Sequence, residues 1–147
     1  MQQRNVWLSL AAAGLVCLAV AGAWGFESIA ARIWEPYTIS VVRNSNVLAT
    51  FDIDQLEALG MKRVKMQGKY EEGPPLLTVL EAAGVQDFET ASIVGLGVRD
   101  SGYLELPRQD IDENVLIDIA NRGTCKIAGP NIAWGDRVRD ITRIEVR

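Results

Sequence analysis

Cys125 carries the only thiol in the larger, C-terminal part of this 147-residue chain. It lies between Arg122 and Lys126, and basic neighbours lower the pKa of a thiol, which favours the nucleophilic and metal-binding thiolate. Cys125 is therefore a candidate metal ligand or redox thiol. The alternative interpretation is a half-buried small residue at the start of a strand, because the sequence supplies no second ligand beside it.

The composition excludes several kinds of catalytic centre. The chain contains no histidine, which rules out Ser-His-Asp and Cys-His relays as well as histidine-ligated zinc or haem. Its two cysteines, Cys17 and Cys125, cannot form a four-cysteine zinc or iron–sulfur site within one chain. The formal net charge of −4 offers no basic face that would neutralise phosphates, so we expect no nucleic-acid partner.

The N-terminal segment has the length and composition of a membrane span. Residues 6–26 carry no charged side chain, and at about 1.5 Å per residue they cross a hydrocarbon core of about 30 Å. Trp7 and Trp24 stand near the two ends, as in an aromatic belt. Arg4 favours a cytoplasmic start. We therefore expect a cytoplasmic N-terminus at residues 1–5 and a transmembrane helix or signal anchor at residues 6–26.

A cleaved secretory signal is the competing interpretation of this segment. The basic start, the apolar stretch and the tripeptide Ala21-Gly22-Ala23 before Trp24 fit a signal-peptidase site. Both interpretations export the remainder of the chain. We therefore expect a single-pass protein of the cell membrane, with residues 27–35 as a stalk and the C-terminal domain in the periplasm or outside the cell.

Residues 36–147 are expected to fold as one α+β domain. Asp52-Ile53-Asp54 opens the run DQLEALG, where an aspartate N-cap and Gly60 bracket a first short helix, and residues 76–85 carry the apolar stripe of a second. Extended or strand-like runs are predicted at residues 37–44, 47–53, 63–70, 91–99, 103–107, 115–121 and 140–147.

The C-terminal region alternates apolar and charged positions. Ile141, Ile144 and Val146 are the expected inward residues of the last strand. The charged residues of this region are interpreted as a solvated strand face, and they are Arg137, Arg139, Asp140 and Arg143.

The order of motifs after residue 36 resembles that of a known family. The run KYEEGPPL that begins at Lys69, the helix LLTVLEAAGV, the turn DSGYLELP and the closing RVRDITRIEVR resemble the sulfite-oxidase-type oxidoreductase molybdopterin-binding domain, in its short membrane-tethered bacterial form. The resemblance covers residues 36–147 and implies a mixed-sheet sulfite-oxidase-like fold. In full-length relatives, a pterin dithiolene and one protein cysteine hold a molybdenum.

The chain departs from this family at the metal ligand. The stretch that holds the family's cysteine corresponds here to Val64–Tyr70, which contains none. Met66 offers a thioether, which is a poor substitute for a thiolate. The family's histidine is also missing. The resemblance in fold therefore does not carry the family's catalytic activity to this chain, and we assign no catalytic residue.

The resemblance also implies which loops meet around a ligand. It brings Lys69 and Tyr70 toward Arg99 and Tyr103, with Trp134 either as a lid over that pocket or as part of the core. Cations and aromatic rings together hold an anionic or planar ligand through charge-assisted hydrogen bonds and stacking. These residues are the candidate cofactor-binding set. The alternative is ordinary surface cations beside tyrosine rings that cover the core.

Three functional hypotheses follow. The first is a membrane-anchored, extracytoplasmic binding or accessory module with the molybdopterin-binding-domain fold and no molybdenum turnover. The second is a small molybdopterin-dependent oxidoreductase that uses Cys125 as its thiolate. The third is a redox subunit of a larger membrane complex.

Overall fold

The computed structural model describes residues 36–66, 68–96 and 102–147. The predicted cytoplasmic start, membrane span and stalk, at residues 1–5, 6–26 and 27–35, lie outside these residues, as does Arg99. Within the described part, no helix is both long enough and apolar enough to cross a membrane. The segment Tyr37–Arg147 forms one compact unit.

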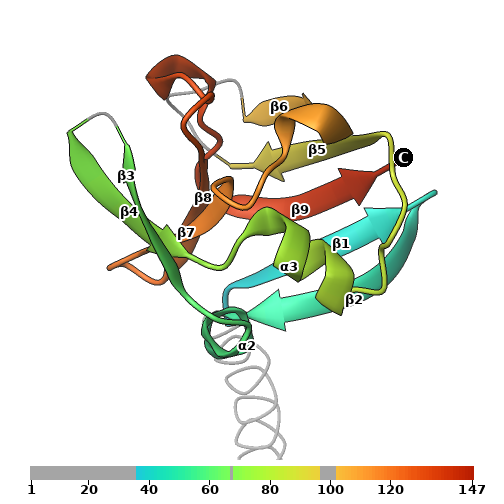
Figure 1. The fold of residues 1–147 in the computed structure, drawn as a ribbon. Helices are drawn as coiled ribbons and strands as arrows, with labels where there is room; N and C mark the ends of the chain where they lie inside the picture. Colours follow the sequence, from blue (N-terminus) through green and yellow to red (C-terminus); the bar gives the residue numbers. More distant parts are fainter. Residues whose placement is uncertain (1–35, 67, 97–101) are drawn as a thin grey trace, which may run out of the picture. The chain divides into compact units, whose positions relative to one another are not determined.

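A five-stranded mixed sheet with the order β2-β1-β9-β5-β6 is the centre of the fold (Figure 1). Its strands β1 and β9 run parallel, and the other neighbouring pairs are antiparallel. The strand closest to the C-terminus therefore lies between strands that come earlier in the chain. The bounds are β1 Thr38–Arg43, β2 Asn46–Asp52, β5 Thr90–Gly95, β6 Tyr103–Pro107 and β9 Ile141–Val146.

Two further hairpins stand beside the sheet. They are formed by β3 (Lys62–Met66) with β4 (Lys69–Gly73), and by β7 (Leu116–Ala120) with β8 (Thr124–Ala128). A β-bridge between Pro75 and Leu116 joins the end of the first hairpin to the second.

Gly73 sets the close approach of the two hairpins. A Cβ at this position would lie 2.0 Å from the carbonyl oxygen of Ile117, which is shorter than any contact between real atoms of these kinds. The Ile117 amide donates to the Pro74 carbonyl at 2.9 Å, and the Leu76 amide donates to the Val115 carbonyl at 2.8 Å. Gly73 has no Cβ, and this allows β4 and β7 to lie against each other. Their polar side chains therefore come together.

Both predicted helices form. The first, α2 (Ile53–Ala58), begins with a capping box in which the Gln55 amide donates to the Asp52 carboxylate at 2.8 Å and the Asp52 amide donates to the Gln55 side chain at 3.0 Å. Gly60 follows the helix with a φ of +101°, which glycine adopts without strain. The second helix is α3 (Leu76–Ala82). Two 3₁₀ turns are also present among the described residues, η1 (Arg108–Asp110) and η2 (Trp134–Asp136).

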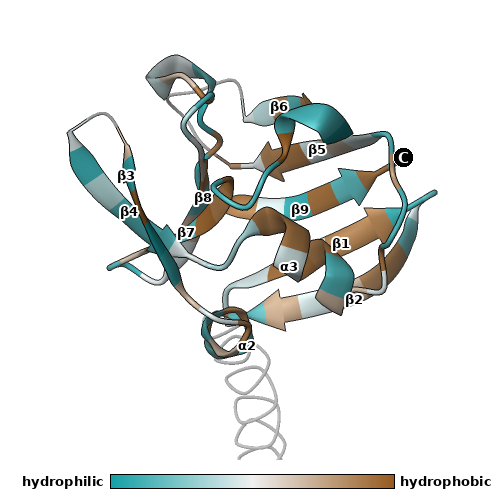
Figure 2. Cartoon of the chain, in the orientation of Figure 1, coloured by the Kyte–Doolittle hydropathy of each residue, from teal (hydrophilic) through white to brown (hydrophobic). Residues whose placement is uncertain are grey.

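The core lies between α3 and one face of the sheet. Figure 1 shows α3 over β1 and β9, and Figure 2 shows hydrophobic segments along β1, β5 and β9. The helix contributes Leu76, Val79 and Leu80 to the same cluster as the strand residues. The expected inward residues of the last strand are confirmed as buried members of this cluster, and they are Ile141, Ile144 and Val146.

The α+β class is confirmed, and one local expectation is wrong. Residues 63–70 were expected to be one extended run, but the chain reverses between Met66 and Lys69 and forms the β3–β4 hairpin. Val64 and Met66 alternate with charged residues on β3, but β4 is mostly polar, so the apolar pattern does not continue past the turn at Gly68 and does not mark the boundary between the two strands.

Candidate functional site

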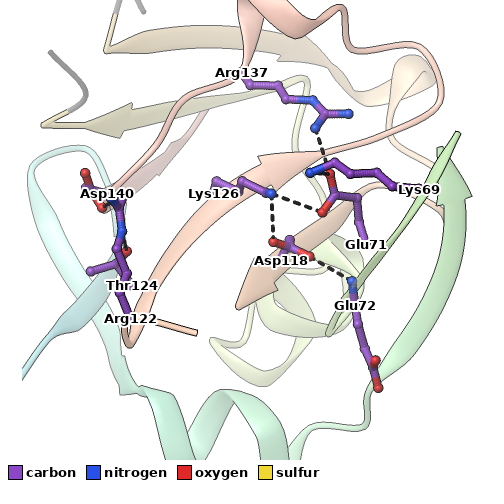
Figure 3. Close-up of polar contacts among 9 residues, drawn as sticks. All are labelled: Lys69, Glu71, Glu72, Asp118, Arg122, Thr124, Lys126, Arg137 and Asp140. Carbon is purple, nitrogen blue, oxygen red and sulfur yellow. Dashed lines mark hydrogen bonds and ion pairs between the residues drawn. The ribbon is translucent and has the colours of Figure 1, made fainter. Parts of the chain in front are cut away.

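A buried carboxylate surrounded by cations is the main polar cluster of the described domain (Figure 3). Glu71, on β4, is only 3% exposed. Its Oε1 accepts from Lys69 Nζ at 2.9 Å and from Arg137 Nη1 at 2.8 Å, and its Oε2 contacts Lys126 Nζ at 3.0 Å. One carboxylate therefore serves three cations, which come from β4, β8 and the segment after η2. We call these residues, with Asp118, the Glu71 cluster.

Asp118 connects the Glu71 cluster to both hairpins. From β7, its Oδ2 lies 3.2 Å from Lys126 Nζ. Its Oδ1 accepts a hydrogen bond of 2.8 Å from the backbone amide of Glu72 on β4. Figure 3 shows these contacts running from the hairpin strands to Glu71. Since Asp118 is buried, its hydrogen bonds hold the cluster in a fixed geometry.

The cations keep Glu71 charged despite its burial. Burial by itself raises the pKa of this carboxyl, but the hydrogen bonds from Lys69, Lys126 and Arg137 outweigh it and lower the pKa from 4.5 to about 2. Glu71 is therefore a permanent counterion at neutral pH, and not a proton donor.

Arg137 is fully buried, which corrects the expectation of a solvated strand face. It precedes β9 and turns inward to Glu71, whereas Arg143, on β9 itself, lies at the surface and pairs with Glu145 at 2.9 Å. The Arg137 Cζ lies 4.1 Å from the centre of the Trp134 ring. Its Nε and Nη2 have no hydrogen-bond partner among the described residues.

A groove of about 930 Å³ adjoins the Glu71 cluster. It is bordered by α2, by β4 and by the β7–β8 hairpin, and both Glu71 and Lys126 line it. The other lining side chains mix charge with apolar surface, and they include Ile53, Met61, Tyr70 and Arg122. A volume of this size falls within the range of small-molecule sites.

Cys125 is a buried residue of β8 and is 1% exposed. Its backbone amide donates to the Tyr37 hydroxyl at 3.1 Å, and that hydroxyl donates to the Ile141 carbonyl. Burial raises the pKa of the Cys125 thiol to about 12 and outweighs the opposing effect of the nearby Tyr37 hydroxyl. The basic neighbours therefore do not produce a thiolate, because Arg122 is paired with Asp140 and Lys126 with Glu71.

The structure brings part of the predicted ligand-binding set together. Lys69 Nζ lies 4.7 Å from the centre of the Trp134 ring. Trp134 is 45% exposed, so it is a surface residue over Arg137 and not part of the core. Tyr70 lines the groove, and its ring lies 4.4 Å from Arg63 Cζ.

The other members of the set lie elsewhere or outside the described residues. The Tyr103 hydroxyl is engaged within the β5–β6 hairpin, where it contacts Glu105 at 2.9 Å and Ser92 at 3.2 Å. Arg99 falls in the segment that the structure does not describe. Cys125 stays a prediction as a metal ligand, and no group of three or more histidine, cysteine, aspartate or glutamate side chains in residues 36–66, 68–96 and 102–147 is arranged to hold a metal.

Sequence reasoning missed the centre of the Glu71 cluster. The signal that could have revealed the cluster is a charged residue inside an apolar strand. Asp118 in LIDIA and Lys126 in TCKIA are such residues. Such charges are rarely buried unless they are paired, so each of them predicts a partner. Glu71 gives no such signal, because it lies in the polar run KYEEG.

The comparisons with known proteins leave the site to be interpreted from its own geometry. No protein-family model matches the chain, and no curated protein matches its sequence.

Proposed function

We propose that this chain is a membrane-anchored, extracytoplasmic binding or accessory module with the sulfite-oxidase-type fold. The anchor and the export rest on the uncharged segment 6–26 and on the basic residue before it. The proposal of a sulfite-oxidase-type fold rests on the order of motifs in residues 36–147, and the mixed α+β architecture is compatible with this fold.

The observation that carries the binding function is the groove beside the Glu71 cluster. Its volume of about 930 Å³ suits a small molecule, and its lining offers both hydrogen-bonding groups and apolar surface. The cluster gives this groove a rigid polar wall, because Glu71 and Asp118 are fixed by contacts with β4 and β8. Preorganised polar groups lose little freedom when a ligand binds, which favours affinity.

The residues present do not fit a molybdenum held by a protein thiolate. The stretch where relatives carry that cysteine folds here as the β3–β4 hairpin, with Met66 buried against Leu116 and Ala128. Cys125 is buried and protonated at neutral pH. No reaction step is therefore assigned to molybdenum, and Cys125 acts as a packing residue in this proposal.

Metal and pterin analysis of the full-length chain tests this proposal. The protein is purified in mild detergent from a host that makes molybdopterin, and a matched Cys125→Ser variant is prepared in the same way. We expect both proteins to contain far less than one molybdenum per chain and to show the same pterin fluorescence. Stoichiometric molybdenum that disappears in Cys125→Ser would overturn the proposal and establish the oxidoreductase alternative.

The location of the domain is tested separately. Alkaline phosphatase fused after Arg147 gains its disulfides only outside the cytoplasm, so we expect an active fusion. An inactive phosphatase together with a fluorescent cytoplasmic reporter at the same position would contradict export.

A further inference from the structure

Arg137 has more hydrogen-bonding capacity than the protein uses. Its guanidinium is 0% exposed, and only Nη1 is engaged, by Glu71 at 2.8 Å. Nε and Nη2 find no acceptor among the residues that the structure describes. In Figure 3 one nitrogen points to Glu71 while the rest of the guanidinium is turned away from that carboxylate. Native proteins leave few buried donors unpaired, and a charged donor is the most costly to leave so.

The two unpaired nitrogens form one recognition edge. Nε and Nη2 carry parallel N–H groups along one edge of the planar guanidinium, and this pair matches two oxygens of one carboxylate, phosphate or sulfate. A lysine or a single amide does not offer this spacing. The shape of the unused edge therefore specifies an oxyanion with two accessible oxygens.

The charge of the Glu71 cluster also favours an anion. Lys69, Lys126 and Arg137 face the carboxylates of Glu71 and Asp118, which leaves one net positive charge. All four carboxylate oxygens already accept a contact. None of these oxygens lies within hydrogen-bond distance of the second edge of Arg137, and one bound anion would balance the charge of the cluster.

Trp134 and Lys69 are partly exposed side chains next to this arginine. The Trp134 ring stacks 4.1 Å from the Arg137 Cζ and is 45% exposed, and the Lys69 Nζ lies 4.7 Å from the same ring. Trp134 belongs to a turn of three residues, and a Cβ at Gly135 would meet nothing within 4 Å. The indole of Trp134, on a short surface turn with a half-exposed lysine beside it, therefore covers one face of the Arg137 guanidinium.

We propose that Arg137 binds a small oxyanion through its Nε–Nη2 edge, with Lys69 as the second cation and Trp134 as the cover. The ligand class is a carboxylate, phosphate or sulfate group. None of these three residues is among those that line the groove, so this inference adds a second site to the proposed binding module.

Titration of the full-length chain in detergent with sodium sulfate, sodium phosphate and sodium acetate tests the proposal, with sodium chloride at matched ionic strength as the reference. The readout is tryptophan fluorescence, and Trp134→Phe identifies the part of the signal that comes from Trp134 among the four tryptophans. We expect a saturable change with at least one oxyanion and none with chloride. Arg137→Lys, which keeps the charge and loses the two-donor edge, should weaken binding at least tenfold.

Arg143→Lys is the matched control, because Arg143 is a surface arginine that pairs with Glu145 on β9. It should bind like the wild type. If circular dichroism shows that Arg137→Lys does not fold, Lys69→Gln replaces it, since Lys69 is half exposed, and a several-fold weaker affinity is expected. The absence of a saturable change in the wild type, or unaltered affinity in the folded variants, would overturn the proposal.

The two proposals fail separately. The titration gives its answer whatever the molybdenum content or the location of the domain. Stoichiometric molybdenum would overturn the binding-module function while leaving an oxyanion isotherm intact, and a missing isotherm would overturn the ligand class alone.

Discussion

Replacing Glu71 with glutamine measures what the Glu71 cluster contributes to stability. The change removes the carboxylate that Lys69, Lys126 and Arg137 share, and leaves a buried guanidinium without this counterion. Removing one partner of a buried pair costs about 3–5 kcal/mol. The pKa of Glu71 leads to a similar figure, because a decrease from 4.5 to about 2 at roughly 1.4 kcal/mol per unit is about 3 kcal/mol. We therefore expect Glu71→Gln to lower the free energy of unfolding by about 3 kcal/mol at neutral pH.

The lowered pKa of Glu71 also determines how its contribution to stability depends on pH. The pKa of Glu71 is lower in the folded protein than in the unfolded chain, so its contribution is fully present above about pH 4.5 and is lost as the pH falls toward about 2. Glutamine does not titrate. The difference in stability between wild type and Glu71→Gln should therefore stay constant down to about pH 5 and shrink by about 3 kcal/mol by pH 2.

Urea-induced unfolding of the full-length chain in nonionic detergent, followed by circular dichroism at a series of pH values, gives both quantities. Glu57→Gln is the matched control, because Glu57 is an exposed glutamate on α2. Its effect should stay within about 0.5 kcal/mol at every pH. A loss below about 1 kcal/mol for Glu71→Gln at neutral pH, or a loss that is unchanged at pH 2, would refute the reasoning.

Three further changes test other parts of the structure. Gly73→Ala places a Cβ 2.0 Å from the Ile117 carbonyl oxygen, so it should lower the free energy of unfolding by about 1–3 kcal/mol or more, and an unchanged urea midpoint would contradict the close approach. The thiol of Cys125, with its pKa raised to about 12, should resist alkylation at pH 8 until urea unfolds the domain, and rapid labelling of Cys125 in a folded Cys17→Ser variant would contradict its burial. Asp52→Ala removes the side-chain half of the capping box and should cost about 1 kcal/mol, whereas Asp52→Asn should retain most of that stability.

The parts of the fold that the sequence predicts are those with local causes. Asp52 and Gly60 bracket α2 because a cap and a left-handed residue act within one turn of the helix. The apolar stripe of residues 76–85 identifies α3 in the same way, and the alternation of the last strand places Ile144 inward.

The parts that the sequence does not predict depend on pairing between distant residues. Nothing near Arg137 in the chain indicates that it faces Glu71, which lies on another hairpin. The depressed pKa of Glu71 and the raised pKa of the Cys125 thiol have the same origin, because both depend on what surrounds a side chain after folding. The basic neighbours of Cys125 in the sequence predict a lowered thiol pKa, which is the opposite direction.

The central position of β9 determines when this domain can complete its fold during synthesis. The β1–β2 hairpin and the β5–β6 hairpin are both local and can form early. Within the sheet, however, these two hairpins are hydrogen-bonded to β9 and not to each other. Residues 141–146 must leave the ribosome and, for an exported chain, the translocation channel before the two hairpins can join. Such non-local pairing gives a high contact order and slow closure of the sheet. Until then the apolar faces of both hairpins remain exposed, and exposed apolar surface on a partly folded chain favours aggregation and chaperone binding.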